Sequence, residues 1–343
     1  MNNHIIAVLK RLPEYKDGKS SFIDSDDGTK IEIISSNSKL HSIKDAAYRE
    51  YFPDGKISYE GWFIKGECYR FNGPSFIKYF SDGRKIEVWC KGTILDRVGG
   101  PAHIEYYANG LPNVLTWFTN GVRHRAENDN TINKRHTEIK YSTEGKVEYM
   151  KWYKAGKIHR NNGPAMIFYD GNVKILEEYW YINDKLNRDD GPAWVKYYEN
   201  GNVYIEEFYI NGIKKRNEGP ACIEYHTNKK TKLETWFDNM NVSRENGPAN
   251  INYYFNGVIK KEEWYINNLL HRENEPAVIK YFPDKTVKYK KWFNNDKLHR
   301  DNNEPVIIYY KLDGTEIKIY KEEELKKISN LILEEVNRVK NEY

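Results

Sequence analysis

The residues best suited to chemistry in this chain are arginines that recur at a fixed place. Each lies eight residues after an aromatic residue: Arg70, Arg97, Arg125, Arg160, Arg188, Arg216, Arg244, Arg272 and Arg300. A row of guanidinium groups could bind the phosphates of a nucleic acid. Glutamates, however, recur two residues before many of the same aromatics: Glu60, Glu87, Glu178, Glu206, Glu234 and Glu262. We therefore expect the arginines to pair with these carboxylates or with turn carbonyls, and nucleic acid is not an expected partner.

Histidines precede several of these arginines, at His124, His159, His271 and His299. Other repeats place Tyr69, Asp96, Asn187, Lys215 or Ser243 there, and such variation is typical of a surface position. A metal site needs clustered ligands, so we predict no metal. Neither a Gly-x-Ser-x-Gly nucleophile motif nor a glycine-rich phosphate loop is present. The sequence therefore predicts no catalytic residues, no cofactor and no enzymatic activity.

The aromatic residues themselves define an internal repeat. They begin at Trp62, Trp89, Trp117, Trp152, Trp180, Phe208, Trp236, Trp264 and Trp292, and most steps are 28 residues long. Such a period indicates a solenoid, propeller or array of small units. In the repeat over 191–219, Asn200-Gly201 is typical of a hairpin turn between two strand-like segments, and Asn211-Gly212 marks a second turn. We predict an all-β fold, an elongated array of about ten stacked antiparallel β-hairpins with a link in each repeat.

Three regions follow from this pattern. Residues 1–39 are interpreted as degenerate capping repeats, because terminal repeats are usually atypical. Residues 40–320 are the tandem 28-residue repeats. Residues 321–343 contain no Gly or Pro and have apolar residues at helical spacing, which predicts an amphipathic helix that caps the array. Dimerisation through this helix is the alternative.

Composition bears on whether the chain is ordered and on where in the cell it is found. The 343 residues carry a net charge of +4, and aromatic residues make up 15% of the chain, more than a disordered chain would have. Three cysteines favour a reducing compartment. We expect no signal peptide, and no apolar run is long enough to span a bilayer. We therefore predict a cytoplasmic protein or, for a viral protein, one of the host cytoplasm or the virion.

Several phrases of the repeat resemble a known family. Tyr253-Tyr254-Phe255-Asn256-Gly257 and Glu262-Glu263-Trp264-Tyr265 are similar to MORN-type repeats. His159-Arg160-Asn161-Asn162-Gly163-Pro164-Ala165 resembles a long-unit variant that is multiplied in giant viruses of amoebae. The resemblance covers about residues 40–320 and departs from ordinary MORN units in its greater repeat length. It implies stacked β-hairpins used for scaffolding, self-association or membrane-proximal contacts, and it implies no catalytic residues.

One repeat is longer than the 28-residue period. Sixteen residues separate Arg125 from Tyr141, seven more than in other repeats, and the extra residues fall within 126–136. Insertions in repeat arrays form loops, often on the binding face. The candidate partner contact is Asn133, Lys134, Arg135 and His136. The alternative is a surface insertion without a function, which costs little loop entropy.

The pattern as a whole favours a non-enzymatic scaffold for protein–protein interaction or structural assembly. Its expected partner is another protein or a second copy of the chain, held by a long aromatic-rich face. The first alternative is peripheral binding to a lipid surface, following the MORN resemblance. The second is an enzyme with its site near the 126–136 insertion.

Overall fold

The computed structural model describes residues 16–24, 28–124 and 136–321. All regular elements in these ranges are β-strands, which confirms the predicted all-β class. The chain divides into two compact units, Met1–Lys185 and Leu186–Tyr343. The predicted helix lies outside the described residues except for Lys321 and stays a prediction, as do the three predicted regions.

One repeat of the second unit shows how the sequence produces the fold. Strands β24 (Trp194–Tyr197) and β25 (Val203–Glu207) form an antiparallel hairpin. In its turn the Gly201 N–H donates to the Tyr198 carbonyl oxygen at 2.8 Å, and the register shifts between Lys196 and Tyr197. Gly201 has a φ of 83°, the left-handed conformation that a type I turn followed by a bulge requires. Asn-Gly therefore predicted the hairpin correctly.

The link predicted after each hairpin is itself a second, shorter hairpin. In the same repeat β26 (Tyr209–Ile210) pairs with β27 (Ile213–Lys214). Its two turn residues, Asn211 and Gly212, have φ of 52° and 84°. Two consecutive positive φ values define a type I′ turn, whose twist suits a two-residue hairpin. Each repeat thus contributes a main hairpin and a short hairpin.

Main hairpins of the first unit follow one another in an antiparallel sheet. In order of pairing, its strands are β1 (Gly18–Ile23), β2 (Lys30–Ser36), β4 (Tyr48–Tyr51), β5 (Ile57–Gly61), β8 (Phe76–Tyr79), β9 (Lys85–Val88), β12 (His103–Tyr106), β13 (Pro112–Thr116), β16 (Glu138–Tyr141), β17 (Val147–Lys151), β20 (Met166–Tyr169) and β21 (Ile175–Tyr179). The short strands are β3 (Lys39–Leu40), β6 (Phe63–Ile64), β7 (Glu67–Cys68), β10 (Cys90–Lys91), β11 (Ile94–Leu95), β14 (Phe118–Thr119), β15 (Val122–Arg123), β18 (Tyr153–Lys154), β19 (Lys157–Ile158) and β22 (Tyr181–Ile182). Strand β23 (Lys185–Leu186) contains the boundary between the units.

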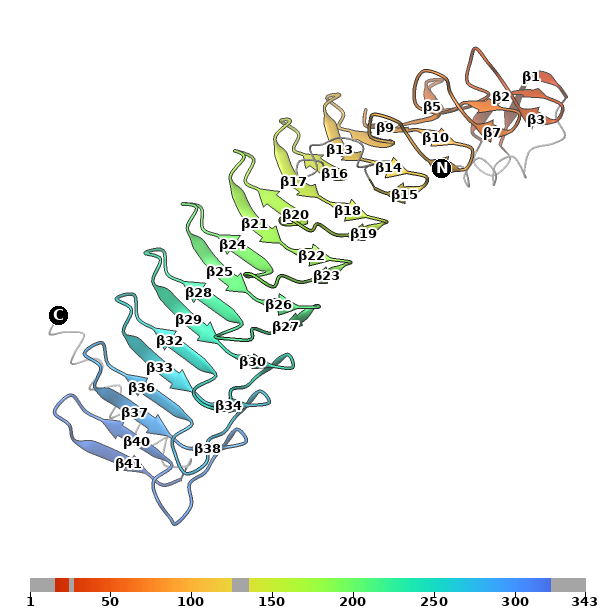
Figure 1. Cartoon of the computed structure of the whole chain (residues 1–343). Helices are drawn as coiled ribbons and strands as arrows, with labels where there is room; N and C mark the ends of the chain where they lie inside the picture. The colour runs from red at the N-terminus through yellow and green to blue at the C-terminus, as the bar shows by residue number, and fades with distance from the viewer. Residues whose placement is uncertain (1–15, 25–27, 125–135, 322–343) are drawn as a thin grey trace. The chain divides into compact units, whose positions relative to one another are not determined.

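The second unit repeats this arrangement (Figure 1). After β24 and β25 its main strands are β28 (Cys222–Tyr225), β29 (Thr231–Thr235), β32 (Asn250–Tyr253), β33 (Ile259–Glu263), β36 (Val278–Tyr281), β37 (Val287–Lys291), β40 (Ile307–Tyr310) and β41 (Glu316–Ile319). Its other short strands are β30 (Phe237–Asp238), β31 (Asn241–Val242), β34 (Tyr265–Ile266), β35 (Leu269–Leu270), β38 (Phe293–Asn294) and β39 (Lys297–Leu298).

The two faces of the main sheets differ in how closely the repeats agree. Successive residues of a strand point to opposite faces, and directly opposed residues share a face. One face, the constant face, carries Arg49 in the repeat of β4 and an Ile or Val at the same place in the later repeats: Ile77, Ile104, Ile139, Ile167, Val195, Ile223, Ile251, Ile279 and Ile308. The other face, the varied face, carries at the adjacent place Tyr48, Phe76, His103, Glu138 and Met166 in the first unit and Trp194, Cys222, Asn250, Val278 and Ile307 in the second.

The largest buried apolar cluster lies on the varied face of the earliest repeats. Ile31, Ile33, Tyr48 and Phe76 are almost completely buried there and pack with neighbouring strands. A smaller cluster around Trp62 packs on the constant face, and another around Ile307 lies at the last hairpin. Apolar burial is therefore concentrated near the described ends of the chain.

Candidate interaction faces

The recurring arginine is part of a stack on the constant face. The Arg244 guanidinium carbon lies 4.0 Å from the centre of the Trp236 ring, and Nη1 donates to the Pro248 carbonyl oxygen at 3.2 Å. Both contacts recur in the pairs Arg70–Trp62, Arg97–Trp89, Arg160–Trp152, Arg216–Phe208, Arg272–Trp264 and Arg300–Trp292. The predicted bond to a turn carbonyl is thus confirmed. Cation–π stacking explains why the aromatic and the arginine keep a constant spacing.

The same stack explains the Gly-Pro of the repeated phrase. Gly247 has a φ of 145°, and a Cβ at this position would meet the Arg244 guanidinium carbon at 3.0 Å. Glycine therefore leaves the space that the guanidinium fills on its way to the proline carbonyl. The phrase Arg-x-x-Gly-Pro is accordingly a structural motif of the constant face.

The recurring glutamates accept hydrogen bonds from tyrosines of the next repeat. The Tyr253 hydroxyl donates to a Glu234 carboxylate oxygen at 2.6 Å, and burial followed by this bond raises the pKa of Tyr253 above its usual value. Equivalent bonds join Tyr79 to Glu60, Tyr106 to Glu87, Tyr225 to Glu206 and Tyr281 to Glu262. The expected pairing of these carboxylates with the recurring arginines is therefore replaced by a glutamate–tyrosine ladder. The spacing could have shown it, because a Tyr lies 19 residues after each of these glutamates.

The position before the arginine joins neighbouring short hairpins. The His159 Nδ1 accepts from the Asn183 backbone N–H at 3.3 Å, and Asp96 Oδ1 and Asn187 Oδ1 accept from the backbone N–H of the corresponding residue in the next repeat. His, Asp and Asn differ in size and charge, but each offers an acceptor. Among the described residues no group of three or more His, Cys, Asp or Glu side chains could hold a metal ion.

Of the four residues predicted to contact a partner, the structure describes one. Asn133, Lys134 and Arg135 lie outside the described residues. The half-buried His136 ring lies edge-on to Trp117 and Trp152, with ring centres 5.3 and 6.3 Å apart. The Trp117 backbone N–H donates to the Thr137 carbonyl oxygen, and the Trp152 backbone N–H donates to the Ala165 carbonyl oxygen in the same way. His136 therefore occupies the place of the repeat proline, between two tryptophans, and its contact with a partner stays a prediction.

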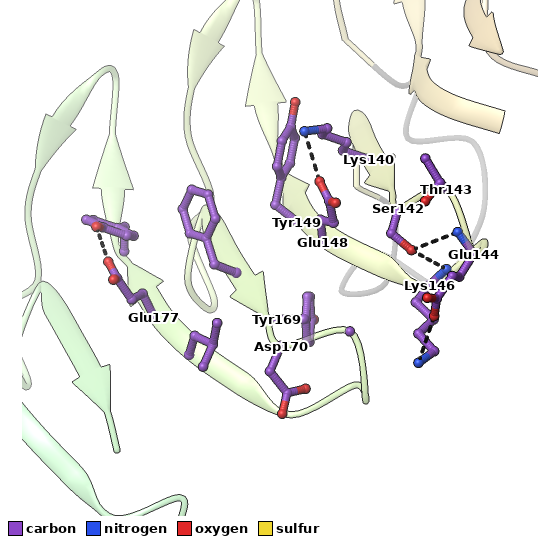
Figure 2. Close-up of a pocket in the computed structure, with 14 residues that line it drawn as sticks. Lys140, Ser142, Thr143, Glu144, Lys146, Glu148, Tyr149, Tyr169, Asp170 and Glu177 are labelled. Atoms are coloured by element: carbon purple, nitrogen blue, oxygen red, sulfur yellow. Dashed lines mark hydrogen bonds and ion pairs between the residues drawn. The ribbon is translucent and has the colours of Figure 1, made fainter. Parts of the chain in front are cut away.

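A hollow of about 790 Å³ opens on the varied face of the first unit, across two successive main hairpins. Figure 2 shows Lys140 and Glu148 beside Tyr149 on one hairpin, with Tyr169, Asp170 and Glu177 on the next. The lining thus combines aromatic rings with both signs of charge, a composition suited to contact with another surface.

Charged groups of this hollow are held in local pairs. Lys140 lies 2.9 Å from Glu148, and Lys146 lies 3.2 Å from Glu144. The Tyr179 hydroxyl donates to Glu177, and Asp170 accepts from the turn N–H groups of residues 172 and 174. These carboxylates therefore stabilise turns and strands. Sequence reasoning missed the hollow, because its residues sit at positions that change from repeat to repeat.

Comparison with known proteins does not assign the chain to a family. No family description and no curated protein matches it. Similar solved structures include the TcdB2–TccC3 complex, at 10% identity and a TM-score of 0.13, and the Photorhabdus luminescens Tc holotoxin pore, at 10% identity and a TM-score of 0.14. They cover 87% and 89% of this chain, which spans 22% and 19% of theirs, about a fifth of their length.

The described residues also bear on membrane insertion. Within 16–24, 28–124 and 136–321, the structure has no helix with the length and apolar character needed to cross a bilayer.

Proposed function

We propose that this chain is a non-enzymatic repeat scaffold that binds a protein partner through its varied face. The difference between the two faces carries the proposal. On the constant face the same Arg–aromatic stacks and Glu–Tyr bonds recur from repeat to repeat. Packing between neighbouring repeats accounts for that regularity.

The varied face has no such regularity. In the second unit it presents the half-buried Trp194, Asn250 and Asn252 beside ion pairs such as Lys232–Glu224 at 2.8 Å. Because the residues of the constant face hold neighbouring repeats together, the residues of the varied face can differ from repeat to repeat without loss of the fold. Half-exposed rings surrounded by polar groups are the usual composition of protein interfaces.

The test compares two variants of the full chain in affinity capture from the native source. Trp194→Ser with Asn252→Glu alters the varied face, and Asn200→Ser with Lys229→Ser alters hairpin turns. We expect quantitative mass spectrometry to show proteins captured by the wild type and the turn variant and lost from the varied-face variant. Identical captured sets, with equal thermal stability of both variants, would contradict the proposal.

A second candidate function, peripheral lipid binding, rests on an exposed apolar row in the first unit. Ile43, Phe71 and Val98 take the same place in successive repeats and are 81%, 85% and 96% exposed. The later repeats place Asn161, Asp189, Asn217, Glu245, Glu273 and Asp301 there. Exposed apolar loop residues can enter the boundary of a bilayer. Sedimentation with vesicles, compared between the wild type and Phe71→Asp with Val98→Asp, tests it: equal sedimentation of the two removes this candidate.

We further propose that the repeats are a long-unit variant of the MORN type in an elongated array capped by a carboxy-terminal helix. The Arg-x-x-Gly-Pro stack and the two hairpins of each repeat support this assignment. A scaffold of this kind suits the cytoplasm or, for a viral protein, the host cytoplasm or virion. Light scattering of the full chain tests self-association. Activity screening of a 126–136 deletion, compared with the wild type, tests catalysis near the insertion.

A further inference from the structure

Five lysines gather on the varied face of the second unit. Lys260 and Lys261 lie on β33, Lys280 on β36, and Lys288 and Lys291 on β37. Lys260 and Lys288 are the extra residues at the register shifts of their hairpins, so the alternation of faces is interrupted there and both charges act on Lys280. These five residues are called the lysine patch. The three strands are successive neighbours in the sheet.

The strand register places these charges directly against one another. Lys261 and Lys280 are opposed across β33 and β36, and Lys280 is opposed to Tyr289 across β36 and β37. The ammonium groups of Lys280 and Lys291 lie over the Tyr289 ring, 5.6 and 5.0 Å from its centre. Lys260 and Lys288 are the neighbours whose charges act most strongly on Lys280. Like charges directly opposed in a sheet are destabilising.

The chain supplies little counter-charge here. Within the described part of the second unit, the ion pair of the lysine patch is Lys261 with Glu263, at 2.9 Å. Burial and the surrounding lysines lower the pKa of Lys280, and burial and Lys261 lower that of Lys291. Other lysines of this face are matched, as in Lys214–Glu207 at 2.7 Å and Lys232–Glu224 at 2.8 Å. The lysine patch therefore concentrates positive charge that the chain leaves largely unpaired, and such repulsion is a cost that binding sites often carry.

We propose that the lysine patch binds a short, strongly acidic polypeptide segment of a protein partner. This inference rests on the proposed function and names the chemistry of that partner. Across three strands the patch is about 10 Å wide, which matches about three residues of an extended chain. Carboxylates at that spacing would complete the ion pairs that the chain leaves unmade.

The surroundings of the Tyr289 ring favour an acidic peptide over a nucleic acid. Binding of a single strand depends on ring faces that are open for base stacking. Here Lys280 and Lys291 cover the Tyr289 ring, and Tyr309 packs against it edge-on with ring centres 5.5 Å apart.

The experiment measures binding of fluorescein-labelled hexaglutamate to the full chain by anisotropy at low and moderate salt. Hexaglutamine, a six-nucleotide single-stranded DNA and phosphatidylserine vesicles are the comparison probes. The patch variant is Lys261→Gln, Lys280→Gln, Lys291→Gln. The matched control is Lys196→Gln, Lys215→Gln, Lys297→Gln, which removes the same charge in the same unit, with Lys196 at the repeat position of Lys280.

We expect hexaglutamate affinity to fall about tenfold in the patch variant and less than about twofold in the control. Added salt should weaken wild-type binding. The unliganded patch variant should unfold at the same or a higher temperature than the wild type, which shows that it folds. Equal hexaglutamate affinity in both variants, or tighter binding of the DNA or the vesicles, would overturn the inference. If partner capture is still lost from the varied-face variant above, the proposed function stands while this inference fails.

Discussion

The earliest repeats and the repeats of the second unit share the same constant face but differ in the residues of their varied face. In both, an aromatic ring carries a stacked guanidinium, as in Trp62–Arg70 and Trp264–Arg272. On the varied face, however, the early repeats bury Tyr48 and Phe76, whereas the second unit places half-buried Asn250 at the equivalent position. The stacks of the constant face are thus common to both regions, whereas the varied face has its largest buried core in the earliest repeats.

The largest expected effect comes from removing a ring of the early core. Phe76→Ala should cost about 3–5 kcal/mol of unfolding free energy, because the ring is 1% exposed and packs against Phe63 and Tyr59. Asn250→Ala, at the same repeat position, should change stability by less than about 0.5 kcal/mol or raise it, because the buried Asn250 Oδ1 has no hydrogen bond. Urea denaturation of both variants measures the difference. Similar losses would show that the varied face contributes equally throughout.

A smaller effect is expected from the stack of the constant face. Arg244→Lys should lose about 1–2 kcal/mol, because an ammonium cannot lie flat on Trp236 and also reach the Pro248 carbonyl as a planar guanidinium does. Arg216→Lys should lose less, because its ring is Phe208 and cations bind Trp more strongly than Phe. Thermal unfolding checks the order, and a reversed order would argue against cation–π stacking as the cause.

The Glu32–Tyr51 pair of the early repeats should make stability depend on pH at both extremes. Hydrogen bonding, first from Lys30, lowers the pKa of Glu32 to about 2, so its contribution is present above pH about 4.5 and is lost as the pH falls through about 2. Burial, and then the bond to Glu32, raises the pKa of Tyr51 to about 12. Its contribution is therefore complete below pH about 10 and lost as the pH rises through about 12.

Glu32→Gln should flatten the acid part of the stability curve, and Tyr51→Phe the alkaline part. Chemical denaturation from pH 2 to 12 measures both. Unchanged slopes in the two variants would mean that other groups dominate the titration.

The smallest expected effect concerns thiol reactivity. Burial, followed by the field of Glu207, raises the pKa of Cys222 to about 12, so about 10⁻⁴ of this thiol is ionised at pH 8. Iodoacetamide should therefore modify Cys222 more slowly than the half-buried Cys90 of the early repeats. Peptide mass spectrometry after timed labelling gives the order, which should disappear once the chain is unfolded.

Much of the fold could be predicted from local signals. Asn200-Gly201 and Asn211-Gly212 act through backbone conformations that do not depend on distant residues, so both turns were found. The short hairpin was interpreted as a link, because strands of two residues, such as β26, carry almost no alternation pattern. The arginines were correctly assigned to structure, but their stacking on the aromatic rings was not predicted.

The candidate contact at 133–136 shows where sequence reasoning stopped. An insertion marks a loop, but nothing in its residues indicated that His136 would stand between Trp117 and Trp152. The hollow around Lys140 and the lysine patch were missed for a related reason. Their residues come from different repeats and are opposed only when neighbouring hairpins pair.

The sequence by itself determined the repeat, its length, its all-β class and the turns, because period and turn chemistry are local properties of the chain. Only the tertiary structure decided which residues share a face. Pairing of successive hairpins aligns Glu234 with Tyr253 on the constant face and opposes Lys261 to Lys280 on the varied face. Such partners are about 19 residues apart along the chain. Hydrogen bonding between neighbouring strands, together with the alternation of side chains and the register shift of each hairpin, sets which of them meet.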